Sequence, residues 1–325
     1  MLLMKKLLLI LLSTLLPSLP ALAEPPATFS EAKVVAREKV YMDQGTSQMG
    51  ELYCGCQWTW VGKSGGRIDA ASCGLKAREQ ANRSQRTEWE HIVPAWTFGN
   101  QRQCWQHGGR EHCVSDDPVF QAMEADLFNL YPSVGEVNGD RSNFNYGMVS
   151  GIAPEYGQCK TKVDFKARVA EPRDDVKGLV ARITFYMFDR YNLSMSRQQQ
   201  QLLMGWNAQY PVTPWEQERD RRITAIMGHA NPFVTGQRTW TLGYKPTGDG
   251  LVSPVPARPS SAPTVAAGTG TVLLTTPVVA NKRSHLYHLP TGCPSYDKVA
   301  PSNRVTFVTE AQAVAAGYHK AGNCQ

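Results

Sequence analysis

The chain has 325 residues, of which 42% are hydrophobic and 19% charged, a composition typical of a globular protein with about two domains. Beyond the first 16 residues, no stretch reaches the roughly 18 apolar residues of a membrane-spanning helix, so the composition excludes an integral membrane protein and a wholly disordered one. The formal net charge is +6, but residues 24–245 contain 26 basic and 25 acidic side chains. The overall charge therefore selects no partner, and any phosphate-binding site has to be local.

The N-terminus has the order of a signal peptide. Lys5-Lys6 precedes the apolar run Leu7–Leu16, and the small residues Ala21-Leu22-Ala23 follow. We expect residues 1–23 to be removed after Ala23, which places the mature protein in the periplasm or outside the cell. An uncleaved anchor helix is the alternative.

The cysteines agree with export. Six of the eight lie before residue 160, and Cys293 and Cys324 lie near the C-terminus. Even numbers of cysteines in both parts of an exported protein predict disulfides. Spacing does not determine how the first six pair, although Cys104 and Cys113 are close enough in the sequence to close a small loop.

Cap signals and apolar spacing predict both helices and strands along the chain. The predicted elements are a helix at 30–42 capped by Ser30, strands with tight turns at 50–75, a helix from Asp117-Pro118 to about Leu130, a helix at 174–192, and a helix from the Thr213 capping box to about Gly228. Residues 24–245 therefore form a main domain of the α+β class.

The composition changes after this domain. Residues 246–271 consist largely of Pro, Gly, Ser, Ala and Thr, which predicts a linker. Residues 272–325 regain aromatic and aliphatic side chains and contain Cys and His, which predicts a small C-terminal domain.

A carboxylate and an imidazole adjoin in the segment Glu88-Trp89-Glu90-His91. Adjacent residues of a strand point to opposite faces, so Glu90 and His91 serve one site only near a strand end or a bend. Pro94 predicts such an early end. The alternative for these two residues alone is a surface carboxylate beside a partly buried histidine.

The whole segment 88–95, with the sequence Glu-Trp-Glu-His-Ile-Val-Pro-Ala, resembles the signature of the endonuclease I family, which comprises periplasmic and secreted non-specific nucleases with a ββα-metal active site. The resemblance covers about residues 30–242 and keeps the order of several motifs. These motifs are Tyr53-Cys54-Gly55-Cys56, Ser72-Cys73-Gly74, Cys104-Trp105-Gln106-His107-Gly108-Gly109-Arg110, the run from Asn129 to Asn138, Arg141-Ser142-Asn143, and Asn231-Pro232-Phe233.

The resemblance implies a role for each matching residue. His91 corresponds to the general base that deprotonates the attacking water. Glu90 and Asn138 correspond to the ligands of one divalent metal ion. Arg110 corresponds to a residue that contacts phosphate, and Glu124 to a further active-site carboxylate.

These residue types suit phosphodiester hydrolysis. A neutral imidazole is an effective base near neutral pH. One carboxylate and one amide oxygen suit Mg²⁺, with Mn²⁺ or Ca²⁺ as alternatives, and leave coordination positions for a phosphate. Asn143 is an alternative to Asn138 as the amide ligand, and Glu88 is expected near the site.

Other arginines carry a weaker signal for DNA contact. Arg219, Arg221 and Arg222 lie on the helix that follows Thr213, and Arg141 lies in an Asn-rich stretch. These arginines either contact the DNA backbone or form a solvated face.

The tail distantly resembles the Ada-type metal-binding module of DNA alkylation repair. That module uses four cysteines, whereas His288 stands at the first position here and the third cysteine is lost around Ala321. A zinc site that combines His288 and His319 with Cys293 and Cys324 is one interpretation. A Cys293–Cys324 disulfide is the other, and export favours it.

The sequence therefore predicts an exported, metal-dependent endonuclease without sequence specificity. We expect it to act as a monomer, without a membrane span, on DNA and RNA, and the resemblance implies 5′-phosphate products. A catalytically inactive DNA-binding or adhesion protein on the same scaffold is the alternative. The expected fold is a mixed α+β core that carries the ββα-metal motif.

Overall fold

A computed structural model describes residues 23–252, 278–307, 310, 313, 318–322 and 324. The predicted signal peptide, except its last residue, and most of the predicted linker lie outside these residues. The chain divides into two compact units, Met1–Pro259 and Ser260–Gln325. Helices and sheets both occur, so the predicted α+β class is confirmed.

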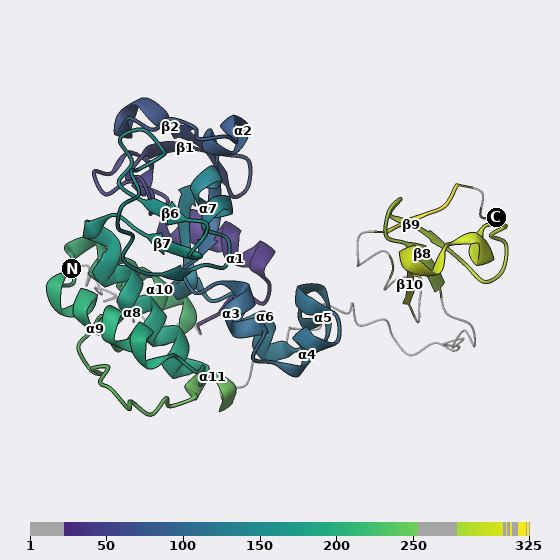
Figure 1. The fold of residues 1–325 in the computed structure, drawn as a ribbon. Coiled ribbons are helices and arrows are strands. Elements are labelled where there is room, and N and C mark those ends of the chain that lie inside the picture. Colours follow the sequence, from purple (N-terminus) through teal and green to yellow (C-terminus); the bar gives the residue numbers. More distant parts are fainter. Residues whose placement is uncertain are drawn as a thin grey trace, which may run out of the picture. The chain divides into compact units, whose positions relative to one another are not determined.

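Three small sheets form the strand content of the first unit (Figure 1). They are the antiparallel hairpin of β1 (Gln57–Val61) and β2 (Gly65–Asp69), the antiparallel pair of β3 (Thr87–His91) and β4 (Leu130–Val134), and a sheet in the order β5 (Asn145–Tyr146), β7 (Val169–Glu171) and β6 (Lys162–Asp164).

Helices surround these strands. They are α1 (Phe29–Val35), α2 (Ala81–Ser84), α3 (Ala95–Gly99), α4 (Gln103–Gln106), α5 (Gly109–Asp116), α6 (Pro118–Glu124), α7 (Gly135–Arg141), α8 (Asp174–Arg190), α9 (Arg197–Gln209), α10 (Pro214–Met227) and α11 (Asp249–Val252). No helix among the described residues is long and apolar enough to cross a membrane.

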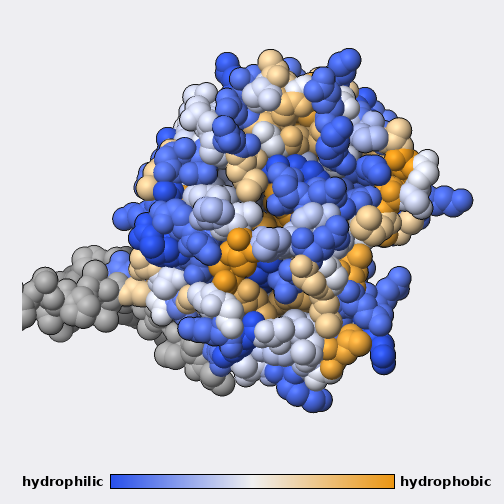
Figure 2. Space-filling model, turned by 90° about the vertical axis from the view of Figure 1, so that its left-hand side faces the viewer, coloured by the Kyte–Doolittle hydropathy of each residue, from blue (hydrophilic) through white to orange (hydrophobic). Residues whose placement is uncertain are grey.

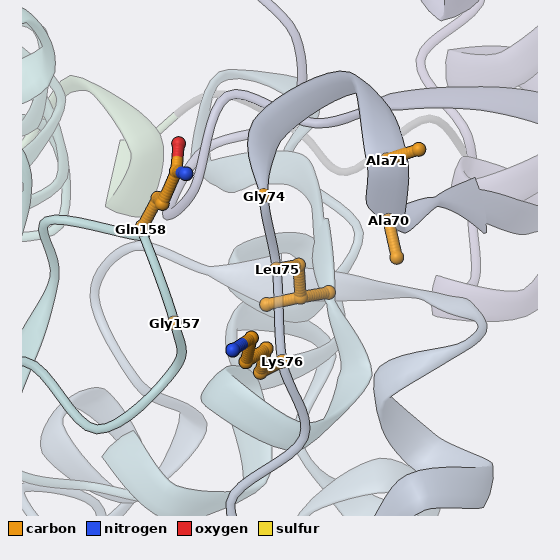
Figure 3. Close-up of a pocket in the computed structure, with 7 residues that line it drawn as sticks. All are labelled: Ala70, Ala71, Gly74, Leu75, Lys76, Gly157 and Gln158. Atoms are coloured by element: carbon orange, nitrogen blue, oxygen red, sulfur yellow. The ribbon is translucent and has the colours of Figure 1, made fainter.

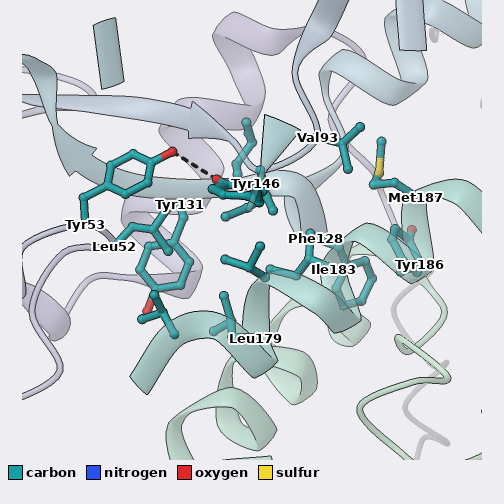
Figure 4. Close-up of a cluster of buried hydrophobic side chains, with 14 of the residues drawn as sticks. Leu52, Tyr53, Val93, Phe128, Tyr131, Tyr146, Leu179, Ile183, Tyr186 and Met187 are labelled. Carbon is teal, nitrogen blue, oxygen red and sulfur yellow. Dashed lines mark hydrogen bonds between the residues drawn. The ribbon is translucent and has the colours of Figure 1, made fainter. Parts of the chain in front are cut away.

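Helix α8 forms the centre of the core. Two acidic residues in its first turn and Arg190 in its last turn complement the helix dipole. Its predicted apolar side, which includes Leu179 and Ile183, faces Leu52 and Tyr131 in the buried cluster of Figure 4. Almost every residue of α8 is buried, which agrees with a helix covered on several sides.

Strands β3 and β4 with helix α7 form the expected ββα unit. His91 at the end of β3 pairs with Leu130 at the start of β4, and α7 follows β4 directly. The amide group of Asn129 holds the entry to this pair, because Asn129 Nδ2 donates to the carbonyl of Val93 at 2.9 Å and Asn129 Oδ1 accepts from the Val93 amide at 2.7 Å.

Arg219 on α10 holds the segment that leads into β4 in place through hydrogen bonds. It is 2% exposed, and its guanidinium donates to the carbonyls of Leu127, Phe128 and Leu130 and to the hydroxyl of Tyr41. An arginine in this position is a structural residue, so both interpretations of Arg219, DNA contact and a solvated helix face, are wrong.

Two predicted helices have different boundaries. The first begins at Phe29 after the cap residue Thr28, not after Ser30, and continues from Ala36 to Val40 as a π-helical turn. The helix that Asp117 caps ends at Glu124 and does not reach Leu130. Asp126 caps a new 3₁₀ turn there and accepts from the amide of Phe128, so the chain leaves the helix before β4.

Two further helix predictions agree with the structure, whereas the predicted linker contains helix α11 (Asp249–Val252). Helix α8 matches the prediction for 174–192, and α10 is capped by Thr213 and ends at Gly228. Helix α9 was not predicted. Residues Thr247 and Gly248, within the predicted linker, donate from their amides to Asp189 of α8.

All eight cysteines form disulfides. The pairs are Cys54–Cys159, Cys56–Cys73, Cys104–Cys113 and Cys293–Cys324. The two pairs suggested by the sequence are therefore confirmed, and the two pairs that spacing left open both lie close to the loop before β1.

The second unit contains a four-stranded sheet in the order β10 (Arg304–Phe307), β8 (Val278–Asn281), β9 (Leu286–His288) and β11 (His319–Lys320). Its core includes Val278, Ala280 and Tyr287. His288 Nδ1 lies 4.0 Å from the disulfide sulfur of Cys324, and His319 is exposed.

Candidate active site

His91 ends β3 and its side chain is 8% exposed. Its ring packs against the ring of Phe29, with centroids 4.7 Å apart, and against Phe98 at 6.1 Å. Burial lowers the pKa of His91 to about 4, so the imidazole is neutral near neutral pH.

The position of the imidazole proton follows from one contact. His91 Nε2 lies 2.8 Å from the backbone carbonyl of Glu124, which only accepts hydrogen bonds. Nε2 therefore carries the proton in the neutral ring, and Nδ1 carries the lone pair that accepts a proton. This orientation is the one that a general base requires.

Glu124 also positions Arg110 through its side chain. Arg110 lies on α5, and its Nε donates to Glu124 Oε1 at 2.6 Å. The Arg110 side chain is 47% exposed, whereas the Glu124 side chain is 7% exposed. Glu124, at the end of α6, thus fixes the imidazole of His91 through its backbone carbonyl and the exposed guanidinium of Arg110 through its carboxylate.

Glu90 points to the opposite face of β3 and is buried. Its Oε1 accepts from Arg141 Nη1 at 2.6 Å and from the hydroxyl of Tyr53 at 2.6 Å. Arg141 also donates to the carbonyls of His91 and Ile92. This arginine is buried within the fold, so both interpretations of Arg141, DNA contact and a solvated face, are wrong.

Glu88 shares the Glu90 face of β3 and lies near the site, as expected. It accepts from Asn138 Nδ2 of α7 at 3.1 Å, and its carboxylate pairs with Arg83 and Arg86. These arginines hold the pKa of Glu88 below its ordinary value although partial burial raises it, so the carboxylate stays charged.

The residues around Glu90 and Asn138 fit a hard divalent cation in their chemistry. Because the amide nitrogen of Asn138 donates to Glu88, its Oδ1 is turned away from that carboxylate and is available as a ligand. The hydrogen bonds from Tyr53 and Arg141 to Glu90 end on Oε1. One carboxylate and one amide oxygen suit Mg²⁺ that keeps several waters.

The alternative ligand Asn143 has a different environment. Its Oδ1 accepts from Arg168 Nη2 at 2.7 Å. Asn138 lies in the helix of the ββα unit and contacts a β3 carboxylate, and the geometry therefore favours Asn138.

The remaining predicted arginines also lie on α10, where Arg221 is exposed and Arg222 is largely covered. Arg221 and Arg222 both pair with Glu218, and Arg222 also pairs with Asp43. They form a charged helix face and do not join the group around His91.

Sequence reasoning missed two residues of this site. Phe29 covers His91 and also lies under two cations, Lys33 at 4.6 Å and Arg110 at 5.6 Å from the ring centroid. Tyr53 was part of a quoted motif, but its hydrogen bond to Glu90 joins positions 37 apart. No local pattern signals either contact.

A shallow pocket lies elsewhere on the first unit. Gly74, Leu75, Lys76 and Gln158 are among its lining residues (Figure 3). It adjoins the Cys56–Cys73 disulfide and contains none of the predicted site residues.

Loss of the Phe29 ring opens one side of His91 to water. Because burial is the main cause of the lowered pKa, we expect Phe29→Ala to raise the His91 pKa from about 4 toward the ordinary 6.5, measured by NMR titration of the metal-free protein. Phe29→Tyr keeps a ring there and serves as the control that stays near 4. An unchanged pKa in Phe29→Ala would show that this ring does not bury His91.

The profile of the Endonuclease I family matches residues 28–237. A periplasmic deoxyribonuclease of Aeromonas hydrophila is 45% identical over 225 residues, which are 69% of this chain and 92% of the relative. An endonuclease-1 of Buchnera aphidicola subsp. Acyrthosiphon pisum is 45% identical over 185 residues, or 57% of this chain and 73% of the relative.

A more distant similarity exists with an extracellular ribonuclease of Bacillus subtilis. It is 32% identical over 127 residues, which are 34% of this chain and 43% of the relative. The family match includes β3, β4 and α7 together with Arg110 and Glu124. This chain therefore belongs to the endonuclease I family and is an endonuclease.

Proposed function

We propose that this endonuclease is exported through its signal peptide and hydrolyses phosphodiester bonds of DNA and RNA without sequence specificity, as a monomer that uses one divalent metal ion. The observation that supports the proposal most directly is the contact between His91 Nε2 and the carbonyl of Glu124. It presents Nδ1 as a fixed base with the correct tautomer.

In this mechanism, His91 Nδ1 accepts a proton from a water molecule that attacks the phosphorus. The depressed pKa keeps the ring neutral and ready to accept that proton. The bond to the 3′ oxygen then breaks, and the leaving oxygen takes a proton from solvent. The products carry the 5′-phosphate that the family resemblance implies.

The guanidinium of Arg110 supplies a positive charge that binds the phosphate of the substrate. Its Nε is held by Glu124, which leaves the planar Nη groups of a half-exposed side chain to contact two phosphate oxygens. Preorganised donors of this kind stabilise the charge that develops in the transition state.

Glu90 and Asn138 would hold the metal ion, Mg²⁺ in the first place and Mn²⁺ or Ca²⁺ as alternatives. When bound between these residues, the ion would offset the negative charge on the phosphoryl oxygens and on the leaving oxygen. The chain supplies the geometry: Arg141 and Tyr53 fix Glu90, and Glu88 orients the amide of Asn138.

The substrate range rests on the relatives. Those from Aeromonas hydrophila are named deoxyribonucleases, and the Bacillus subtilis relative is named a ribonuclease. The groups that we assign to the substrate, Arg110 and His91, act on a phosphate that DNA and RNA share.

The face of the molecule in Figure 2 is largely hydrophilic, with apolar side chains in small separate groups.

Removal of the base is the first test. We expect His91→Ala to lower the rate of plasmid cleavage about a hundredfold or more, because general base catalysis contributes about that much. DNA binding, measured by gel shift with a chelator present, should persist. His107→Ala removes an exposed histidine between α4 and α5 and serves as control. Cleavage by His91→Ala near the parental rate would contradict the assignment.

The amide ligand is the second test. Asn138→Ala should raise the Mn²⁺ concentration for half-maximal cleavage at least about tenfold and weaken Mn²⁺ binding in calorimetry, because a metal ligand is lost. Asn143→Ala is the matched control and should behave like the parent. The reverse result would assign the ligand to Asn143, and two unchanged titrations would show that neither amide binds the metal.

A further inference from the structure

The second unit presents a group of basic side chains at one end of its sheet. We call the group the basic edge, and it consists of Lys282, Arg283, His285, His319 and Lys320. All five are exposed. The first three lie in the loop between β8 and β9, and the last two form β11.

The fold gathers these residues from two distant segments. Strand β11 pairs in parallel with β9, so His319 lies level with Leu286 at the end of the β8–β9 loop. The amide of His319 donates to the carbonyl of His285 at 2.9 Å. The basic edge is therefore a fixed part of the sheet and does not depend on a charged run in the sequence.

Among the described residues, no carboxylate pairs with the basic edge. Residues 260–325 contain five Lys and Arg but only two acidic residues, Asp297 and Glu310. Glu310 accepts from the hydroxyl of Tyr287, and no ion pair occurs among the described residues of this unit. Exposed like charges held together in this way favour an anionic partner.

The shape of the loop adds a second observation. His285 has a φ of 55°, in the left-handed region that residues other than glycine rarely adopt. Its ring stacks on Tyr318, with centroids 5.3 Å apart and an interplanar angle of 26°. Backbone strain of this kind is often found at binding sites, and a stacked ring pair beside cations suits a nucleic acid.

We propose that the basic edge binds the phosphate backbone of nucleic acid and so tethers the substrate to the chain that cleaves it. The inference rests on the proposed function. Two binding sites on one chain raise the effective concentration of the polymer at the active site, which lowers KM and leaves kcat unchanged. Arg110 and His91 would then act on a substrate that the second unit retains.

A nucleic acid fits this surface better than an anionic membrane. Proteins that lie on a membrane insert exposed Trp, Phe or Leu side chains beside their basic residues. Among the described residues of the second unit, no large apolar side chain is strongly exposed. The surface offers cations and one stacked ring pair, which are the groups that contact a nucleic-acid strand.

The test uses the full chain with His91→Ala, so that binding is measured without cleavage. A fluorescent DNA duplex is titrated at several salt concentrations, with Lys282→Gln, Arg283→Gln and Lys320→Gln combined in the variant. We expect Kd to rise about tenfold and the slope of log K against log salt to become shallower by about 2 to 3, since each phosphate contact contributes about 0.9.

Single substitutions separate a local surface from bulk charge. Arg283→Gln should weaken binding clearly, whereas Lys298→Gln, which removes the same charge from another exposed position of the unit, should not. Equal losses from both would overturn the proposal. Binding of the combined variant at parental strength would also overturn it, as would charge-dependent binding to phosphatidylglycerol vesicles with none to DNA.

The proposed function is tested separately in the same series. With His91 intact, the combined variant should cleave plasmid with a raised KM and an unchanged kcat. If the parent cleaves and the variant has the same KM, the tether is wrong and the endonuclease mechanism stands. If the parent lacks cleavage, the mechanism is wrong whatever the basic edge binds.

Discussion

The proposed mechanism depends on a single hydrogen bond, from His91 Nε2 to the carbonyl of Glu124. It fixes the ring plane and leaves the lone pair of the neutral ring on Nδ1. The bond requires the end of β3 and the end of α6 to meet. Asn129 ensures this by joining Val93 to the chain just before β4, and Arg219 holds the carbonyls on the other side of the same segment.

The buried pair of Glu90 and Arg141 joins the two faces of β3. Burying two charges is costly, and loss of one partner typically costs about 3–5 kcal/mol. Here the arginine donates both to Glu90 Oε1 and to the carbonyl of His91. One guanidinium therefore fixes the carboxylate proposed as metal ligand and the strand end that carries the base. Arg141 therefore fixes the relative positions of Glu90 and His91, whose side chains point to opposite faces of β3.

Local signals in the sequence predicted a large part of this arrangement. The caps Asp117 and Thr213 located two helix starts, and Pro94 correctly placed the end of a strand near His91. Signals of this kind act within one turn of chain. The burial of Arg141 and the cover that Phe29 gives to His91 depend on contacts between distant segments, such as the 51 positions between Arg141 and Glu90. Composition and residue spacing do not predict such long-range contacts.

The most direct test of this account is the protonation of the His91 ring itself. Nitrogen-15 NMR of the metal-free protein, labelled at histidine and measured near neutral pH, distinguishes the two ring nitrogens. The account predicts a neutral ring with its proton on Nε2 and a bare Nδ1. A proton on Nδ1, or on both nitrogens, would contradict it, because the ring would then have no base to offer to a water molecule.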